Sequence, residues 1–122
     1  MRKLVQLDED GWCVEIDHPK LRRVALEFKA WLSTVDPDQD SFGFLKQDLP
    51  LVEAALSGQM VLPYKGFEPH TRELGEGWLP RDYTKVSAPF YNTIRGANRS
   101  IETIQKDGKR YAWVDFEEPD NT

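Results

Sequence analysis

The sequence predicts an α+β domain in which an antiparallel sheet of about four to six strands packs against one long and one shorter helix. Three observations support this: an Asp-Gly pair between two strand-like runs near the C-terminus, an alternating apolar pattern near the N-terminus, and an apolar stripe of helical period between them. A chain of 122 residues has the size of one domain, so we expect a single domain over residues 1–122.

A C-terminal hairpin is predicted for residues 100–117. Two runs, SIETIQ and RYAWVDFEE, are rich in β-branched and aromatic residues and flank the pair Asp107-Gly108. An Asp-Gly pair tolerates the positive φ angles that a tight hairpin turn requires. We therefore expect two adjacent antiparallel strands at the centre of the sheet.

A second hairpin is predicted at the N-terminus. Residues 3–7 form the first strand candidate, and residues 8–11 form a polar turn that ends in Gly11. In residues 12–16, Trp12, Val14 and Ile16 alternate with polar or small side chains, which is the pattern of a half-buried strand.

The long helix is predicted to begin at Pro19, with Asp17 or His18 as its cap, and to end at about Thr34. We expect its apolar stripe to pack on the sheet. The residues of the stripe recur at spacings of three and four: Leu21, Val24, Ala25, Phe28, Trp31, Leu32 and Val35.

The shorter helix is predicted after Asp48, which can cap it, with Pro50 in its first turn and Gly58 at its end. Residues 60–62 then resemble a brief strand. Residues 63–89 contain repeated Pro and Gly and are predicted to form a long irregular connection. Residues 89–95 are predicted to form another strand.

The composition indicates a reducing compartment. Cys13 is the only cysteine, so an intramolecular disulfide is excluded. The first ten residues contain no apolar run of a signal peptide, and no stretch has the length and apolar character of a membrane span. We therefore expect a cytoplasmic protein without a membrane partner.

Reactive side chains are sparse, so the sequence predicts no catalytic group, metal site or cofactor. Cys13 lies in a strand pattern, and His18 and His70 lack the spacing of a metal motif. Residues 75–77, Gly-Glu-Gly, lack the lysine of a phosphate-binding loop and the strand–helix context of a dinucleotide fingerprint. We expect a protein that is not an enzyme.

Charge is unevenly distributed along the chain. The net charge is −5, which argues against a surface wrapped in nucleic acid. Residues 36–53 and 115–120 each carry a net charge of −4, whereas residues 81–110 carry +4. The alternating Asp36, Asp38 and Asp40 fail the EF-hand pattern, because Ser41 and Gln47 stand where that pattern needs Gly and Glu.

In size, acidity and expected architecture, the whole chain resembles the immunity proteins encoded beside bacterial contact-dependent or polymorphic toxins. This resemblance includes no shared motif. It implies a non-catalytic domain that binds and neutralises a cognate toxin, such as a nuclease, through an acidic surface. We expect the docking face to combine the acidic loop of residues 36–41, its neighbouring aromatics and the acidic tail: Asp36, Asp38, Asp40, Phe42, Phe44, Asp115, Glu117 and Glu118.

Two alternatives remain open on the sequence. The first is a small enzyme or ligand-binding domain with a pocket under the 63–89 connection, lined by His70, Glu73, Trp78 and Tyr83. The second is a nucleic-acid adaptor that uses the basic stretch of residues 81–110, where aromatic residues are interleaved with Arg95, Arg99 and Arg110.

Overall fold

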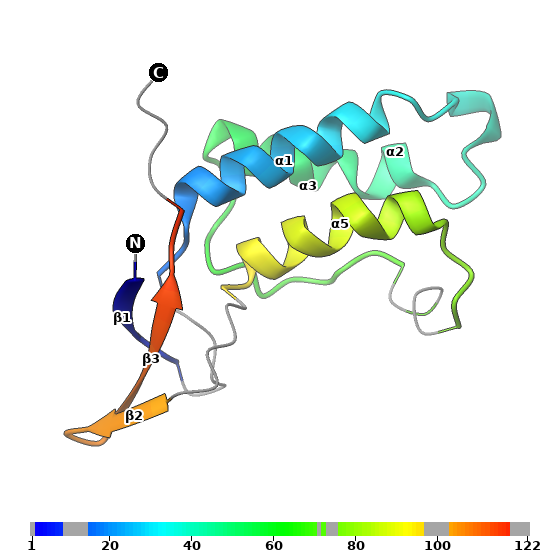
Figure 1. The fold of residues 1–122 in the computed structure, drawn as a ribbon. Helices are drawn as coiled ribbons and strands as arrows, with labels where there is room; N and C mark the ends of the chain where they lie inside the picture. The colour runs from blue at the N-terminus through cyan, green and yellow to red at the C-terminus, as the bar shows by residue number, and fades with distance from the viewer. Residues whose placement is uncertain (1, 9–14, 71, 73–75, 97–102, 118–122) are drawn as a thin grey trace.

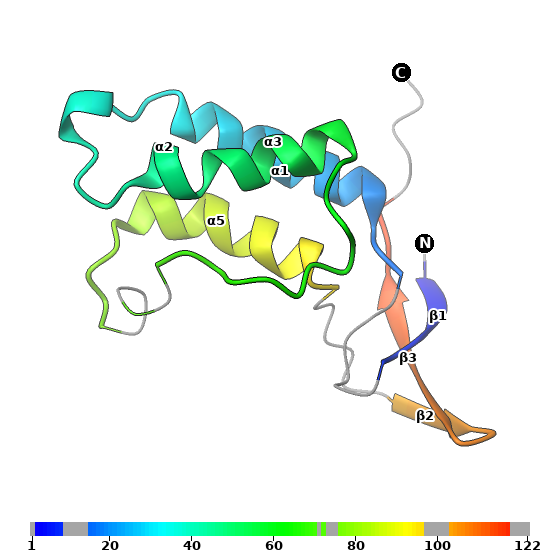
Figure 2. The same cartoon turned by 180° about the vertical axis from the view of Figure 1, so that it is seen from behind.

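The computed structural model describes residues 2–8, 15–70, 72, 76–96 and 103–117. Within these residues the helices pack together, and a small antiparallel sheet lies beside them (Figures 1 and 2). The α+β class predicted from the sequence is confirmed. In this part of the chain, no helix combines the length and apolar character that crossing a membrane requires.

The sheet has the strand order β1-β3-β2, with β1 at Arg2–Gln6, β2 at Thr103–Lys106 and β3 at Lys109–Asp115. Both pairs are antiparallel. The predicted turn joins β2 to β3, and its two residues, Asp107 and Gly108, have φ angles of 55° and 78°. The predicted C-terminal hairpin is therefore confirmed, but only β3 lies at the centre of the sheet, whereas β2, which we also expected there, lies at its edge.

The part of the predicted N-terminal hairpin that the structure describes contains its first strand but no partner strand after it. β1 pairs with β3, so its partner comes from the other end of the chain. Glu15 and Ile16 are not in a strand, and residues 12–14 lie outside the described residues. Residues 60–62 form no strand either, and the sheet in the described segments has three strands rather than four to six.

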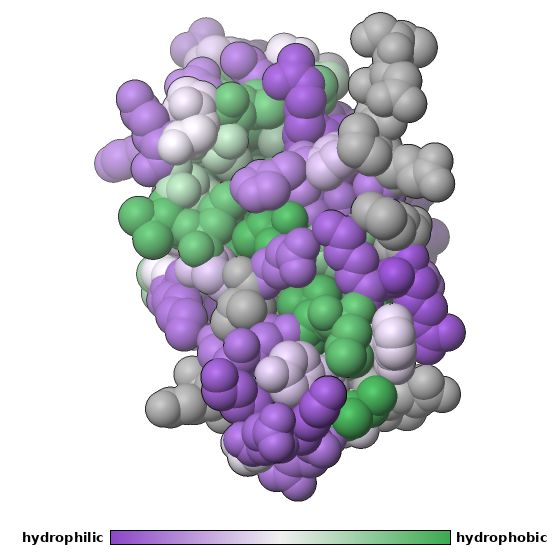
Figure 3. All heavy atoms as spheres, turned by 90° about the vertical axis from the view of Figure 1, so that its left-hand side faces the viewer, coloured by the Kyte–Doolittle hydropathy of each residue, from purple (hydrophilic) through white to green (hydrophobic). Residues whose placement is uncertain are grey.

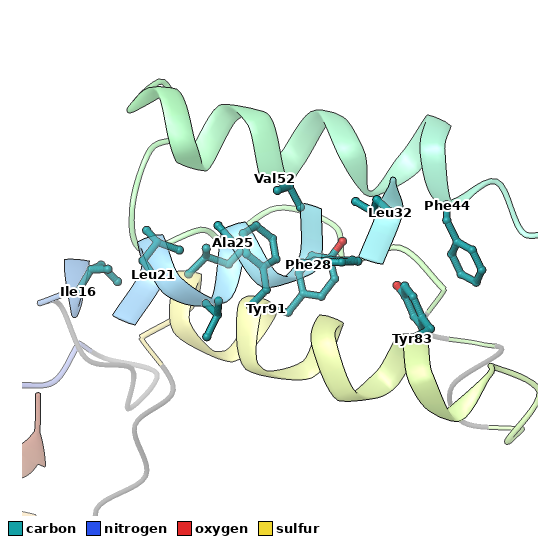
Figure 4. Close-up of a cluster of buried hydrophobic side chains, with 12 residues drawn as sticks. Ile16, Leu21, Ala25, Phe28, Leu32, Phe44, Val52, Tyr83 and Tyr91 are labelled. Atoms are coloured by element: carbon teal, nitrogen blue, oxygen red, sulfur yellow. The ribbon is translucent and has the colours of Figure 1, made fainter. Parts of the chain in front are cut away.

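Helix α1, at His18–Leu32, begins one residue before the predicted start at Pro19 and is capped by Asp17, whose side chain accepts a hydrogen bond from the backbone N–H of Lys20. Five residues of the predicted stripe are buried, and Trp31 and Val35 are half-buried, but the stripe packs on α3 (Leu49–Ser57) and α5 (Arg81–Ile94) rather than on the sheet. Phe28 lies at the centre of this helical core (Figure 4).

Helix α5 corrects two predictions: the connection after residue 63 ends before Arg81, and residues 89–95 belong to a helix rather than a strand. Pro89 lies inside α5. Because Pro lacks a backbone N–H, we expected Pro89 to lie at the boundary of an element. The buried side chains before and after Pro89 nevertheless follow a helical period. They are Tyr83, Ser87, Phe90, Tyr91, Thr93 and Ile94.

Helix α3 confirms the predicted shorter helix, including its end at Gly58, which has a φ of 75°. A single helical turn, α2, precedes it at Phe44–Gln47, and a 3₁₀ turn lies at Pro37–Gln39. Asp48 separates α2 from α3.

The sheet has a small core of its own, formed by Val5, Ala112, Val114 and Phe116, with Leu7 packed against it. Asp17 connects this sheet to the helices. Its buried carboxylate caps α1 with one oxygen and accepts a 2.8 Å hydrogen bond from the backbone N–H of Glu117 with the other. The end of β3 is thereby fixed to the start of α1.

Candidate functional site: a buried carboxylate network and an acidic loop

The most concentrated polar chemistry in the described residues surrounds Asp48, which is 0% exposed. We expected its side chain to cap α3, but it makes no capping hydrogen bond. Its Oδ1 instead accepts hydrogen bonds from the hydroxyls of Tyr83, at 3.0 Å, and of Tyr91, and its Oδ2 lies 3.0 Å from Nε2 of His70. We call these four residues the Asp48 network.

Aromatic rings enclose the network on the side of α2. Phe44 stacks on Tyr83 with ring centroids 4.4 Å apart, and the His70 ring meets both rings edge-on. Burial raises the pKa of Asp48 above its usual value, although its hydrogen bonds and His70 act against that rise. Burial and the neighbouring carboxylate raise the pKa values of Tyr83 and Tyr91 above the ordinary value of a tyrosine.

This arrangement connects three parts of the fold. Asp48 lies between α2 and α3, the two tyrosines lie on α5, and His70 lies in the connection before α5. His70 has a φ of 62°, which is uncommon for a residue with a side chain, so its surroundings hold it in a strained conformation. The side chains of His70 and Asp48 are 2% and 0% exposed, so neither can reach a substrate in solution in this conformation.

The enzyme alternative placed four residues around a pocket. The structure brings His70 and Tyr83 together, with their ring centroids 5.6 Å apart. Trp78, by contrast, is 60% exposed, and Glu73 lies outside the described residues. The imidazole of His70 is buried against Asp48. The sequence analysis did not predict this contact.

The acidic loop, residues 36–41, follows the C-terminal end of α1 and has a fixed backbone. Oδ1 of Asp36 accepts a 2.9 Å hydrogen bond from the N–H of Asp38. The two carboxylate oxygens of Asp40 accept 2.9 Å hydrogen bonds from the N–H groups of Phe44 and Leu45. Asp36 and Asp38 are exposed, whereas Asp40 is half-buried and caps α2.

The two aromatic residues beside the loop lie in different environments. Phe44 is 5% exposed and belongs to the helical core, so it does not form part of the surface on which we expected it. Phe42 is half-buried and stacks on Phe44 with ring centroids 5.3 Å apart. Phe42 is therefore the aromatic neighbour of the acidic loop that a partner could reach.

The acidic tail lies away from the acidic loop. Glu117 is bonded to Asp17 at the start of α1, whereas the loop follows the other end of that helix, about 20 Å away for its 15 residues. Asp115 is exposed, Glu117 pairs with Arg23, and Glu118 lies outside the described residues. The hydrogen bonds from Arg23 lower the pKa of Glu117. The predicted docking residues therefore do not form one continuous face.

The basic residues of the nucleic-acid alternative are also dispersed. Arg95, at the end of α5, donates a 3.1 Å hydrogen bond to the carbonyl of Gly66 and lies 3.4 Å from Glu68. Arg110 is exposed on β3, and Arg99 lies outside the described residues. Within the described segments, no group of three or more His, Cys, Asp or Glu side chains is positioned to hold a metal ion.

Function has to be inferred from the geometry of this chain. No protein-family model matches the sequence, and no curated protein or solved structure is significantly similar to it.

Proposed function

We propose that this protein is a non-catalytic binding domain of the toxin-inhibitor type, which captures a basic protein partner through its acidic loop. The observation that carries the proposal is that this loop exposes acidic side chains on a backbone held by hydrogen bonds. Asp36 and Asp38 are exposed to solvent, while the side chains of Asp36 and Asp40 accept hydrogen bonds from backbone N–H groups and so fix the backbone of the loop.

A fixed loop favours binding because little conformational entropy is lost when a partner docks. Two exposed carboxylates on one turn also attract a basic cleft over a distance of about 10 Å at moderate ionic strength. An inhibitor that occupies the cleft of a nuclease would replace the charge of the phosphate backbone in this way.

Phe42 supplies an aromatic contact next to these charges. Its ring is half-buried and stacks on the ring of Phe44, so its position is already fixed in the unbound protein. Rigid aromatic side chains surrounded by charged residues are a common arrangement at binding hot spots.

The buried chemistry supports a binding role over an enzymatic one. The Asp48 network holds the only histidine–carboxylate pair among the described residues, and both side chains are almost fully buried. Its hydrogen bonds connect α5 and the preceding connection to the α2–α3 junction, which stabilises the end of the helical core beside the acidic loop.

The test uses the proteins encoded on either side of this gene as candidate binding partners, and the proposal predicts that one of them contains a cytotoxic domain that this protein binds. The variant Asp36→Asn/Asp38→Asn removes two charges and keeps a capping oxygen at residue 36. The matched control, Glu27→Gln/Asp82→Asn, removes two exposed charges from α1 and α5. We expect the loop variant to lower the association rate constant by about tenfold or more and to flatten its salt dependence.

Equal association rates for the wild type and the loop variant would contradict the proposal. So would the absence of a cytotoxic domain in the neighbouring proteins, or a failure of the wild-type protein to protect cells that express such a domain.

A further inference from the structure

The sheet has two faces of different character. Val5, Ala112 and Val114 point to the face that carries the small core, and all three are buried. Because side chains alternate along a strand, the residues between them point to the opposite side. We call this opposite side the outer face of the sheet.

Apolar and aromatic side chains meet on the outer face. The register places Leu4 opposite Trp113 and Ile104 opposite Tyr111, and antiparallel partners at opposed positions lie on the same face. Leu4 is 43% exposed and Ile104 is 39% exposed, while the two aromatic residues are half-buried. Figure 3 views the side of the molecule on which β1 lies, and apolar side chains reach the surface there among polar ones.

Positive charge borders this patch. Arg2, Lys106 and Lys109 occupy outer-face positions, and all three are exposed. Lys106 and Lys109 lie directly opposite each other across the hairpin. Without a bound anion, two like charges at opposed positions destabilise the sheet. Asp115, opposite Arg2, is the acidic residue among these positions. In a chain with a net charge of −5, a locally basic patch indicates an anionic ligand.

We propose that the outer face of the sheet binds single-stranded nucleic acid. Tyr111 and Trp113 are two positions apart on β3, which places their rings on one face with about 6.7 Å between the Cα atoms. This spacing lets two neighbouring bases of an extended strand stack on the two rings. The lysines at the hairpin and Arg2 then contact phosphates on either side.

The Trp113 ring already binds a planar cation. The guanidinium carbon of Arg2 lies 5.5 Å from the centroid of the Trp113 ring. A base that stacks on Trp113 takes the place of this guanidinium, which remains close enough to contact the adjacent phosphate. The aromatic pair distinguishes this ligand from an acidic protein, for which the basic residues alone would be enough.

The binding test uses fluorescence anisotropy with labelled oligomers of thymidine and of uridine, about twelve nucleotides long, at about 50 mM salt. We expect the wild-type protein to bind both oligomers and the fluorescence of its tryptophans to change on binding. With three cations involved, raising the salt to about 200 mM should weaken the affinity by about 20-fold. Failure of the wild-type protein to bind either oligomer would overturn the proposal.

Two variants test the two parts of the site. Trp113→Leu keeps an apolar side chain in the sheet and should weaken binding by about tenfold. Lys106→Glu/Lys109→Glu should abolish measurable binding, whereas the matched control Arg81→Glu/Lys85→Glu, which changes exposed residues of α5, should leave it unchanged. Circular dichroism establishes that each variant is folded.

Two results would reject this assignment. Equal weakening by the two charge variants would indicate diffuse attraction rather than a site. Full affinity in Trp113→Leu, together with equally effective displacement by polyglutamate, would assign the patch to an acidic protein partner instead. Because the outer face shares no residue with the acidic loop, either result leaves the toxin-inhibitor proposal standing.

Discussion

The Nε2 atom of His70 lies 3.0 Å from Oδ2 of Asp48, and the two side chains are 2% and 0% exposed. The two residues are 22 positions apart in the sequence, so this contact fixes the connection before α5 against the junction of α2 and α3. The hydroxyls of Tyr83 and Tyr91 bind the other oxygen of the same carboxylate. One buried carboxylate therefore holds three segments of the helical core together.

Replacing Asp48 by alanine should destabilise the protein by about 3 kcal/mol or more, because the two tyrosine hydroxyls and the imidazole would lose their partner in a buried site. Asp48→Asn keeps the shape and one acceptor oxygen and should cost less. The free energy of unfolding is measured by urea denaturation. The exposed Asp38→Ala serves as the control and should change stability by less than about 0.5 kcal/mol. Equal stability of Asp48→Ala and Asp38→Ala would show that the network contributes nothing to the fold.

The pKa of Asp48 predicts a particular pH dependence of stability. Its pKa is raised in the folded chain, so between the unfolded and folded pKa values the folded state binds the proton more tightly. The stability that this carboxyl contributes is present below about pH 4 and is lost as the pH rises through its folded pKa. The stability advantage of the wild type over Asp48→Asn should therefore shrink as the pH rises above about 4.

The comparison with Asp48→Asn separates this effect from other groups. Burial also raises the pKa of Glu68, and hydrogen bonds from Arg23 lower that of Glu117, but both residues remain in the variant. Urea denaturation of both proteins at several pH values measures the difference directly. A difference that grows with rising pH would mean that the carboxylate form is favoured in the fold, contrary to this account.

Much of the fold could be predicted from local patterns. The Asp-Gly pair correctly located the β2–β3 hairpin, and the helical period, with Pro near each start, correctly located α1 and α3. The pairing of β1 with β3 was missed because it joins residues from opposite ends of the chain, which no local pattern reveals. Helix α5 was missed because Pro89 was read as a boundary although the apolar period continues through it.

The Asp48 network could be predicted only in part. Asp48 was recognised as the residue before a helix, a position at which a side chain usually caps the backbone. Reading residues 81–94 as a helix would have placed Tyr83 and Tyr91 on one face, eight positions apart. The approach of His70 depends on the path of an irregular connection, and the sequence contains no periodic signal for it.

Asp17 and Glu117 differ in what they contribute to the junction between sheet and helices. Asp17 is 2% exposed and binds two backbone N–H groups, so Asp17→Ala should cost about 1–2 kcal/mol. The pair of Glu117 with Arg23 is exposed, so Glu117→Gln should cost less than about 1 kcal/mol, and salt should reduce that cost. Thermal unfolding at low and high salt measures both effects. A larger loss for Glu117→Gln than for Asp17→Ala would mean that the surface pair, rather than the buried cap, holds the junction.

Phe28 should be among the most sensitive apolar positions of the helical core. Its side chain is 0% exposed and its ring meets those of Tyr83, Phe90 and Tyr91 edge-on, at centroid distances of 5.5–6.0 Å. Phe28→Ala removes these contacts and leaves a cavity between α1 and α5, so we expect a loss of about 3–5 kcal/mol in the free energy of unfolding. Leu26→Ala, on the same helix but 46% exposed, is the matched control and should cost less than about 1 kcal/mol. If both substitutions have the same small effect in urea denaturation, the packing of α1 against α5 does not dominate the stability of this fold.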